Sequence, residues 1–158
     1  MTSPLRFGME GDVRQGRIRA IAICVFRRGD EILAAEWYDT VKGQYFYRPL
    51  GGMIEFGERS ERTVERELME ELGAEVTDLR YVTIMENLFV HNGEQGHEIV
   101  LLYEGKLVDR ALYEVEAIDG RDDGDVPLRA VWKPLSFFGP SAPLYPDGLL
   151  GLLEKSPG

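Results

Sequence analysis

The sequence predicts an α/β protein in which a mixed β-sheet is sandwiched between helices. Three observations support this fold class. Short β-rich runs lie on both sides of one charged helix, the first run is apolar on both faces, and another helix candidate lies near the end. A strand buried on both faces needs an element above and below the sheet. The 158 residues contain no internal repeat or low-complexity linker, so we expect one domain over residues 1–158.

Three strands are expected before the helix. Arg17 to Phe26 carries apolar side chains on both parities, and Arg28-Gly29-Asp30 predicts a turn into a second strand, Glu31 to Trp37. Gln44 to Arg48 is a short aromatic strand that ends at a proline. Gly51-Gly52 follows, where the backbone can turn tightly and approach a ligand.

The helix is expected over Thr63 to Leu72, with Ser60 as its N-cap and Gly73 as its stop. At 100° per residue, its apolar side chains fall on one narrow stripe, and Glu71 lies next to Val64 at the edge of that stripe. Burial there would raise the pKa of Glu71 unless a cation or a hydrogen-bond donor compensates.

The second half of the chain is again rich in strands. Tyr81 to Val90 and Glu98 to Leu107 predict a hairpin around a loop at His91 to Gly96. Ala111 to Asp125 is interpreted as a polar loop or an irregular acidic segment. The remaining candidates are a last strand and two short helices, at Leu128 to Trp132, Pro134 to Phe138 and Asp147 to Lys155.

Glu67, Glu70 and Glu71 stand at i, i+3 and i+4, so their carboxylates meet on one side of the helix. Like charges at this spacing repel, and a sequence tolerates them when a cation lies between them. Mg²⁺ prefers such oxygen ligands. The alternative is a solvated charged face, but residues 54–75 hold eight Glu against three Arg, so pairing within the segment is incomplete.

These residues belong to a longer pattern: Gly, five residues, Glu, seven residues, then Arg-Glu-apolar-any-Glu-Glu-any-Gly-apolar. The pattern resembles the Nudix box. Its polar and glycine positions are met by Gly52, Glu58, Arg66, Glu67, Glu70, Glu71 and Gly73. Leu68 fills the first apolar position, and Ala74 stands where the family usually has Ile, Leu or Val. So many fixed positions make the pattern far more specific than a lone glycine motif.

The resemblance implies a Nudix fold, an α/β/α sandwich with a mixed sheet and the box as loop–helix–loop. It implies hydrolysis of a nucleoside diphosphate linked to another group: water attacks one phosphorus of the pyrophosphate bridge, with Mg²⁺ or Mn²⁺ present. The expected partner is a small-molecule nucleotide, which can be a nucleoside di- or triphosphate or a nucleotide sugar. The family also contains many homodimers.

The same resemblance suggests roles for individual residues. Glu67, Glu70 and Glu71 are the expected metal ligands of the catalytic centre, joined by the carbonyl of Gly51. Arg66 is expected to orient carboxylates, with a plain surface cation as the alternative. Glu58 is expected to be structural or to bind metal through water.

The sequence indicates the general base and the substrate contacts less clearly than the metal ligands. The base is expected to be a glutamate of the box or Glu98, at the start of a strand, whose alternative is an exposed strand-end carboxylate. Arg48, Tyr47 and Phe89 are candidates for phosphate or base contacts, and for each aromatic the alternative is the core. We find neither the downstream proline typical of ADP-ribose hydrolases nor the SQPWPFP-like run of NADH hydrolases.

The composition argues against nucleic-acid-binding, membrane and secreted proteins. The net charge is −10, and two segments, residues 54–75 and 111–125, each carry −5. An acidic protein lacks the electrostatic footprint of a duplex-binding module, so no nucleic-acid polymer is expected. No apolar run approaches the ~20 residues of a membrane span. We see no secretory signal in Met1 to Asp12, and with one cysteine we expect a cytoplasmic protein.

Two other functions remain open at this stage. One is a Nudix-fold sensor that binds a nucleotide without hydrolysing it, although the complete box argues against it. The other is an isomerase on the same fold, which would need a reactive cysteine in a pocket. Cys24 lies in an apolar strand-like run instead and is expected to be a buried hydrophobe.

Overall fold

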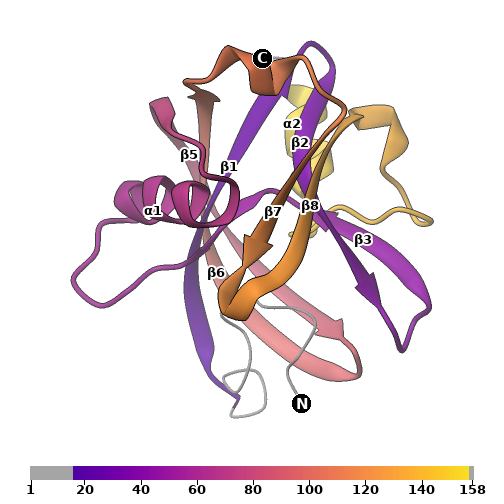
Figure 1. Ribbon diagram of the computed structural model, residues 1–158. Helices are drawn as coiled ribbons and strands as arrows, with labels where there is room; N and C mark the ends of the chain where they lie inside the picture. Colours follow the sequence, from indigo (N-terminus) through magenta and orange to yellow (C-terminus); the bar gives the residue numbers. More distant parts are fainter. Residues whose placement is uncertain (1–15, 157–158) are drawn as a thin grey trace.

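The computed structural model describes residues 16–156 (Figure 1). Within these residues, four strands precede α1 and four more lie between α1 and α2, with short 3₁₀ turns among the later strands. The bounds are β1 Ile18–Arg28, β2 Glu31–Asp39, β3 Gln44–Arg48, β4 Leu50–Met53, α1 Ser60–Leu72, β5 Val76–His91, β6 Glu94–Leu107, β7 Ala117–Asp122, β8 Val126–Pro134 and α2 Leu149–Lys155.

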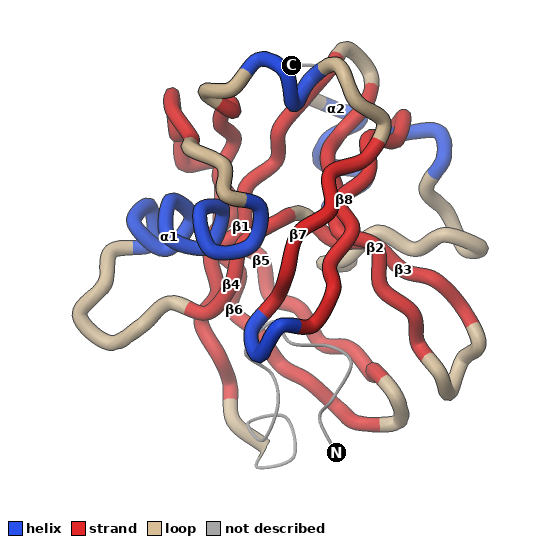
Figure 2. The backbone as a smooth tube through the Cα atoms, in the orientation of Figure 1, coloured by secondary structure: helices blue, strands red, loops and turns tan. Residues whose placement is uncertain are grey.

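The strands form a mixed sheet that divides into two halves. Its order is β5-β6-β1-β2-β8-β7, with β4 added to β1 and β3 added to β2. β1 and β6 run parallel, and every other pair is antiparallel. β1 and β2 pair only at their turn, through Arg27–Ile32 and Arg28–Glu31, and then separate (Figure 2). Beyond the turn, β1 pairs with β4 and β6, whereas β2 pairs with β3 and β8.

The side chains of β1 alternate between two cores, which is why the strand is apolar on both parities. One core contains Ala22, Cys24 and Phe26 of β1 together with Val64 and Leu68 of α1. The other contains Ile21, Ile23 and Val25 of β1 together with Leu149 and Leu153 of α2. The two helices therefore cover opposite faces of the strand, and the predicted α/β/α arrangement is confirmed.

The prediction of a loop over residues 111–125 is wrong. The segment contains β7, which pairs with β8 from Ala117–Val131 to Asp122–Val126. β7 is the edge strand of its half-sheet, and edge strands are commonly charged because charge opposes pairing with other chains. Only Ile118 and Asp122 of this strand are buried. The alternation of buried and exposed side chains is therefore short, and the acidic residues make it hard to recognise in the sequence.

Three local predictions also need correction. Gly51 and Gly52 do not form a turn; they lie in β4, opposite Ile23 and Ala22 of β1. Ser60 is not the N-cap, because it is the first helical residue, and its hydroxyl lies 2.6 Å from the hydroxyl of Tyr103. The loop expected at 91–96 is a tight turn between β5 and β6, so those strands are longer than predicted.

The predicted end of the helix is confirmed: Gly73 caps α1 in the left-handed conformation, with φ 63°. The two C-terminal helix candidates become a 3₁₀ turn at Leu135–Phe137 and the helix α2. Within residues 16–156, no helix has the length and apolar character needed to cross a membrane.

Candidate functional site

The two acidic segments of the sequence meet where α1 packs against β7. Gly120 of β7 makes this approach possible: a Cβ atom at this position would lie 2.0 Å from the carbonyl oxygen of Glu71. The contact places Asp122 and Asp123, at the end of β7, beside Glu67 and Glu71 of α1, close enough for their charges to raise the pKa of both glutamates.

Three carboxylates converge at this contact. Glu67, Glu70 and Asp123 each offer an oxygen, and these oxygens all lie within 4.8 Å of one another. Glu67 is buried, whereas Glu70 and Asp123 are exposed, so the group opens to solvent on one side. A set of several carboxylate oxygens suits a hard divalent cation such as Mg²⁺ or Mn²⁺. Sequence reasoning missed Asp123, because the acidic segment that contains it was interpreted as a loop.

Glu71 and Glu67 are buried without enough positive charge around them. Glu71 is 4% exposed, and its Oε1 atom has no hydrogen-bond partner in the described part of the chain. Burial, and then the charges of Glu67 and Asp122, raise its pKa well above the usual value. Burial also raises the pKa of Glu67 to about 8, and Arg66 opposes this increase only in part. A bound cation would compensate both groups, so the residues present fit a divalent metal ion.

The side chain of Glu67 lies close against the backbone of β4 at Gly52. A Cβ atom on Gly52 would lie 1.6 Å from Oε2 of Glu67, so only glycine lets the carboxylate rest against β4. Gly51, the predicted carbonyl ligand, immediately precedes this position in β4. The glycines of the motif therefore allow the acidic helix to approach the sheet closely.

Arg66 donates hydrogen bonds to three carboxylates of the motif and is not a plain surface cation. Its Nε and Nη2 atoms donate to the two oxygens of Glu58 at 2.8 and 3.0 Å. Its Nη1 atom donates to Glu67 and Glu70, each at 3.2 Å, and Nη2 also donates to the carbonyl of Met53 at 3.1 Å. One guanidinium thus orients three carboxylates and ties α1 to β4.

Glu58 is the carboxylate that Arg66 holds most firmly. Besides Arg66, it accepts hydrogen bonds from the Thr63 hydroxyl at 2.7 Å and from the Glu55 N–H at 3.2 Å. The hydrogen bonds from Arg66, more than those from Thr63, lower the pKa of Glu58 to about 2 against the effect of burial. Both oxygens are engaged, and Glu58 is not among the three converging carboxylates, which favours the structural role over metal binding.

Glu98 belongs to a second buried polar group. It is 1% exposed, and its Oε1 atom accepts from Nη2 of Arg48 at 3.2 Å and from Nδ2 of Asn87 at 3.3 Å. It is therefore not the exposed strand-end carboxylate that sequence reasoning allowed, and it does not join the converging carboxylates of α1.

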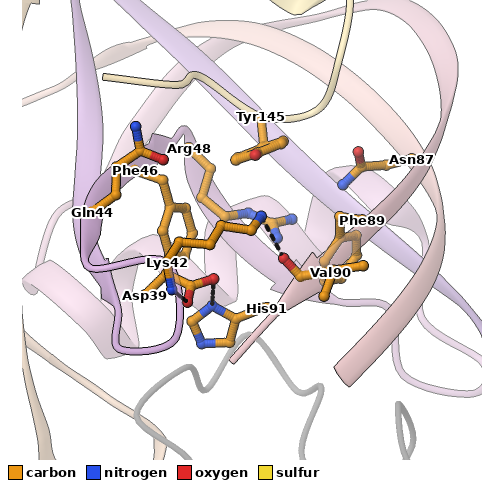
Figure 3. A pocket seen from close by; sticks show the side chains of 10 residues that line it. All are labelled: Asp39, Lys42, Gln44, Phe46, Arg48, Asn87, Phe89, Val90, His91 and Tyr145. Carbon is orange, nitrogen blue, oxygen red and sulfur yellow. Dashed lines mark hydrogen bonds and ion pairs between the residues drawn. The ribbon is translucent and has the colours of Figure 1, made fainter. Parts of the chain in front are cut away.

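Arg48 and Asn87 also line a pocket between the tips of the β2–β3 and β5–β6 hairpins (Figure 3). Phe89, a predicted substrate contact, is in this pocket, but Tyr47 is not. Tyr47 is buried on the other face of β3, where its hydroxyl donates to Glu36 at 2.8 Å. The lining residues are Asp39, Lys42, Gln44, Phe46, Arg48, Asn87, Phe89, Val90, His91 and Tyr145.

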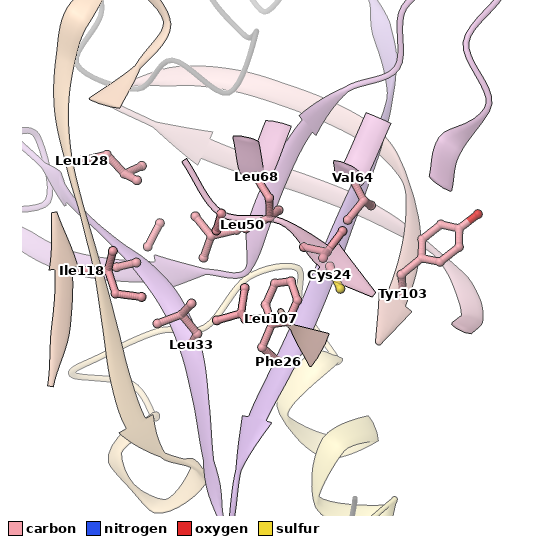
Figure 4. Close-up of a cluster of buried hydrophobic side chains, with 14 of the residues drawn as sticks. Cys24, Phe26, Leu33, Leu50, Val64, Leu68, Tyr103, Leu107, Ile118 and Leu128 are labelled. Carbon is pink, nitrogen blue, oxygen red and sulfur yellow. The ribbon is translucent and has the colours of Figure 1, made fainter. Parts of the chain in front are cut away.

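Cys24 is a core residue, as expected (Figure 4). It is fully buried, and burial, with the nearby Glu104, raises the pKa of its thiol well above the usual value. A thiol in this state is inert, so the structure offers no nucleophile for the isomerase alternative at this position.

Known proteins resemble both the sequence and the fold. Residues 16–140 match the model of the NUDIX domain family. A "NAD-capped RNA hydrolase NudC" of Chromobacterium violaceum is 31% identical over 116 residues, which are 70% of this chain and 43% of that protein. A protein of the same name in Erwinia tasmaniensis is 45% identical over 73 residues, 44% of this chain and 27% of that protein. The chain thus matches less than half the length of these relatives.

Solved structures share the fold at lower sequence identity. A MutT NUDIX hydrolase from Burkholderia pseudomallei superposes with a TM-score of 0.61 at 19% identity, over 89% of this chain and 98% of that one. The E. coli ORF135 protein superposes with a TM-score of 0.52 at 22% identity, over 87% of each chain. The family match covers most of the chain and includes the complete motif on α1, so the chain belongs to the Nudix family.

Proposed function

We propose that this protein is a metal-dependent pyrophosphohydrolase that cleaves the P–O–P bridge of a small nucleoside diphosphate derivative. The observation that carries the proposal is the convergence of Glu67, Glu70 and Asp123 beside the buried, uncompensated Glu71. A divalent ion at this point would neutralise the polyphosphate and lower the pKa of a bound water. The protein's own part is to hold the carboxylates in place.

The roles of the residues follow from their contacts. Glu67, Glu70 and Asp123 would hold the ion, with Glu71 behind them. Gly51, the residue before Gly52, keeps its proposed role as a carbonyl ligand. Arg66 orients Glu67 and Glu70 through charge-assisted hydrogen bonds. For the general base, the geometry favours a glutamate of α1 over Glu98, because Glu98 does not lie among the converging carboxylates.

The substrate class is narrower than the family allows. The NudC relatives are named for NAD-capped RNA, but the SQPWPFP-like run of NADH hydrolases does not occur in this sequence. The net charge of −10 disfavours a long polyanionic substrate. We therefore propose nucleoside di- or triphosphates or nucleotide sugars as substrates.

Four substitutions test the proposal. Glu70→Gln, Glu71→Gln and Asp123→Asn should each lower Mg²⁺-dependent product release by at least about 100-fold, because each removes one carboxylate from the site. Asp119→Asn is the matched control: this residue lies on β7 but is exposed and pairs with Arg129, so activity should stay within about twofold. Products should be resolved by mass on a panel of nucleotides, and thermal melting should confirm that each variant is folded.

Two results would contradict the proposal. Full activity in all three site variants would remove the metal centre from the mechanism. Tight nucleotide binding without turnover across the panel, with Mg²⁺ and with Mn²⁺, would favour the sensor alternative instead.

A further inference from the structure

The half-sheet that contains β5, β6 and β1 extends past the part that α1 covers (Figure 1). The helix packs in the same core as Ala22, Cys24 and Phe26 of β1. Ile18 and Ala20 lie earlier on the same face of that strand, because side chains alternate along a strand, and both are exposed. The end of the half-sheet that holds the start of β1 therefore has one face that no helix of the described chain covers.

Large apolar side chains from three strands lie together on this face. Ile18 of β1 pairs with His97 of β6, which pairs with Leu88 of β5, and residues paired across strands share a face. The same register adds further members two and four residues along the strands. The open face consists of five larger apolar side chains: Ile18, Ile84, Leu88, Ile99 and Leu101.

The two faces of these strands reverse the usual arrangement of apolar and polar side chains. Arg19, Asn87 and Glu98 alternate with the open face and are 4%, 1% and 1% exposed. Ile18 and Leu88, on the open face, are 62% and 54% exposed. A half-solvated sheet ordinarily has its apolar side chains inside and its polar ones outside. Contiguous exposed apolar side chains, unlike scattered ones, are typical of a surface that binds another molecule.

The charges favour a second copy of this chain as the partner. The net charge is −10, so most faces of two copies repel each other. On the open face, the acid Glu86 is matched by His97, whose Nε2 atom lies 3.0 Å from Oε2 of Glu86. A two-fold axis brings the same pair from the other copy, so each carboxylate can meet an imidazole across the contact. An identical face therefore complements this one in both apolar character and charge.

The size of the open face predicts a weak dimer. The strand spacing and the rise per residue give an area of about 20 Å by 15 Å, or about 300 Å², once the side chains at its rim are included. A standard specific interface buries about 800 Å² on each partner, and smaller ones belong to transient contacts. We therefore expect a dissociation constant in the range of about 10 to 300 µM.

We propose that the open face packs against the same face of a second copy, sheet on sheet, in a weak two-fold dimer. Sheets packed in this way lie about 10 Å apart and bury the side chains between them. Ile18, Ile84 and Leu88 of each copy would form the centre of the contact. The inference does not depend on the proposed hydrolysis, because it rests on the packing of the sheet alone.

Sedimentation velocity across a range of about 1 to 500 µM tests the dimer. The wild-type protein should shift reversibly from one chain to two. Leu88→Glu should raise the dissociation constant at least about 10-fold, because it places a charge inside an apolar contact. Val115→Glu is the matched control: Val115 is 41% exposed and its carbonyl accepts from Arg28, at the opposite end of β1 from Ile18. It adds the same charge and should leave the constant within about twofold.

Mixing two variants shows whether the face meets itself. Leu88→Glu and Leu88→Lys should each associate less than the wild type, because like charges face each other across the two-fold axis. A mixture of equal amounts, with one variant carrying a fluorescent label, should form a mixed dimer at least about 10-fold more tightly than either variant alone. The same pair of substitutions at Ile84, which is 55% exposed, provides a second series if a Leu88 variant melts early.

Thiol labelling separates a second copy from any other cover. Cys24, the one native cysteine, is fully buried, so Leu88→Cys adds a single reactive thiol. At about 1 µM this thiol should react with a maleimide as fast as a small model thiol, and at 500 µM the rate should fall by about twofold or more as the dimer forms. The proposal is overturned if the wild type stays a monomer at 500 µM, if the mixed variants do not associate, or if the thiol is already protected at 1 µM.

Discussion

The carboxylates of α1 and its preceding loop are held in two different ways. On the Arg66 side, Glu58 receives two hydrogen bonds from the guanidinium, and its pKa falls to about 2. On the side that faces β7, Glu71 is buried, one of its oxygens has no partner within residues 16–156, and its pKa is raised. The protein completes the first arrangement by itself. The second leaves one oxygen of Glu71 without a partner among the described residues, and a bound cation would supply one.

The largest effect on stability is expected from Arg66→Met. This substitution would leave Glu58 without its counter-charge, as Glu71 already is on the other side. Glu58 would lose its counter-charge, and Glu67 would lose its only direct cationic contact among the described residues. Removing one partner of a largely buried ion pair costs about 3–5 kcal/mol. We expect a loss of this size in urea denaturation at pH 7 without divalent ions.

Arg62→Met serves as the control for this substitution. Arg62 lies on the same helix and pairs with Glu65, but its side chain is 72% exposed, so the change should stay within about 0.5 kcal/mol. Equal losses in the two variants would show that Arg66 contributes no more than a surface residue, and the contrast between the two sides would disappear.

A smaller effect, with opposite signs on the two sides, is expected when a single carboxylate is neutralised. Glu58→Gln should destabilise the metal-free protein by about 1–3 kcal/mol, because an amide cannot replace an ionised partner for Arg66. Glu71→Gln should instead stabilise it at pH 8 by about 1 kcal/mol, because a buried group that resists ionisation is replaced by a neutral one. Unfolding should be measured in the presence of a chelator. A loss of stability in both variants would mean that the metal-free protein already satisfies Glu71.

The parts of this site that the sequence predicts are those set by short-range patterns within one helix or strand. The 3.6-residue period placed Glu67, Glu70 and Glu71 together, and the end of the helix at Gly73 followed from the backbone preference of glycine. Tyr47 was proposed beside Arg48, although neighbours on a strand face opposite sides; their parity alone argued against it.

The parts of the site that the sequence could not predict depend on contacts between segments far apart in the chain. Asp123 joins the site only because β7 pairs with β8 and Gly120 admits α1 against it. Asn87 meets Glu98 through the register of two long strands, which no local pattern sets. The charge of −5 on residues 111–125 was visible, but nothing in the sequence said that it would lie against the other acidic segment.

A further expected effect is a dependence of stability on pH that belongs to one side only. The pKa of Glu67 is about 8 in the folded protein and near 4.5 when unperturbed. An acid whose pKa is raised by folding is most stabilising below its unfolded value, so without metal the stability should fall as the pH rises from about 4.5 to 8. Glu58, with a pKa of about 2, contributes no slope in this window.

Magnesium should oppose that fall, because it binds the ionised carboxylates and replaces the missing counter-charge. We expect Mg²⁺ to raise the melting temperature by about 2–4 °C at pH 8, which corresponds to about 1 kcal/mol for a protein of this size, and to have little effect at pH 5. Sodium chloride at equal ionic strength is the control. Glu67→Gln should reduce the metal-free slope, and the raised pKa of Glu71 should account for the slope that remains. An equal magnesium effect at both pH values would mean that the ion binds elsewhere, since protonated glutamates at pH 5 cannot hold it.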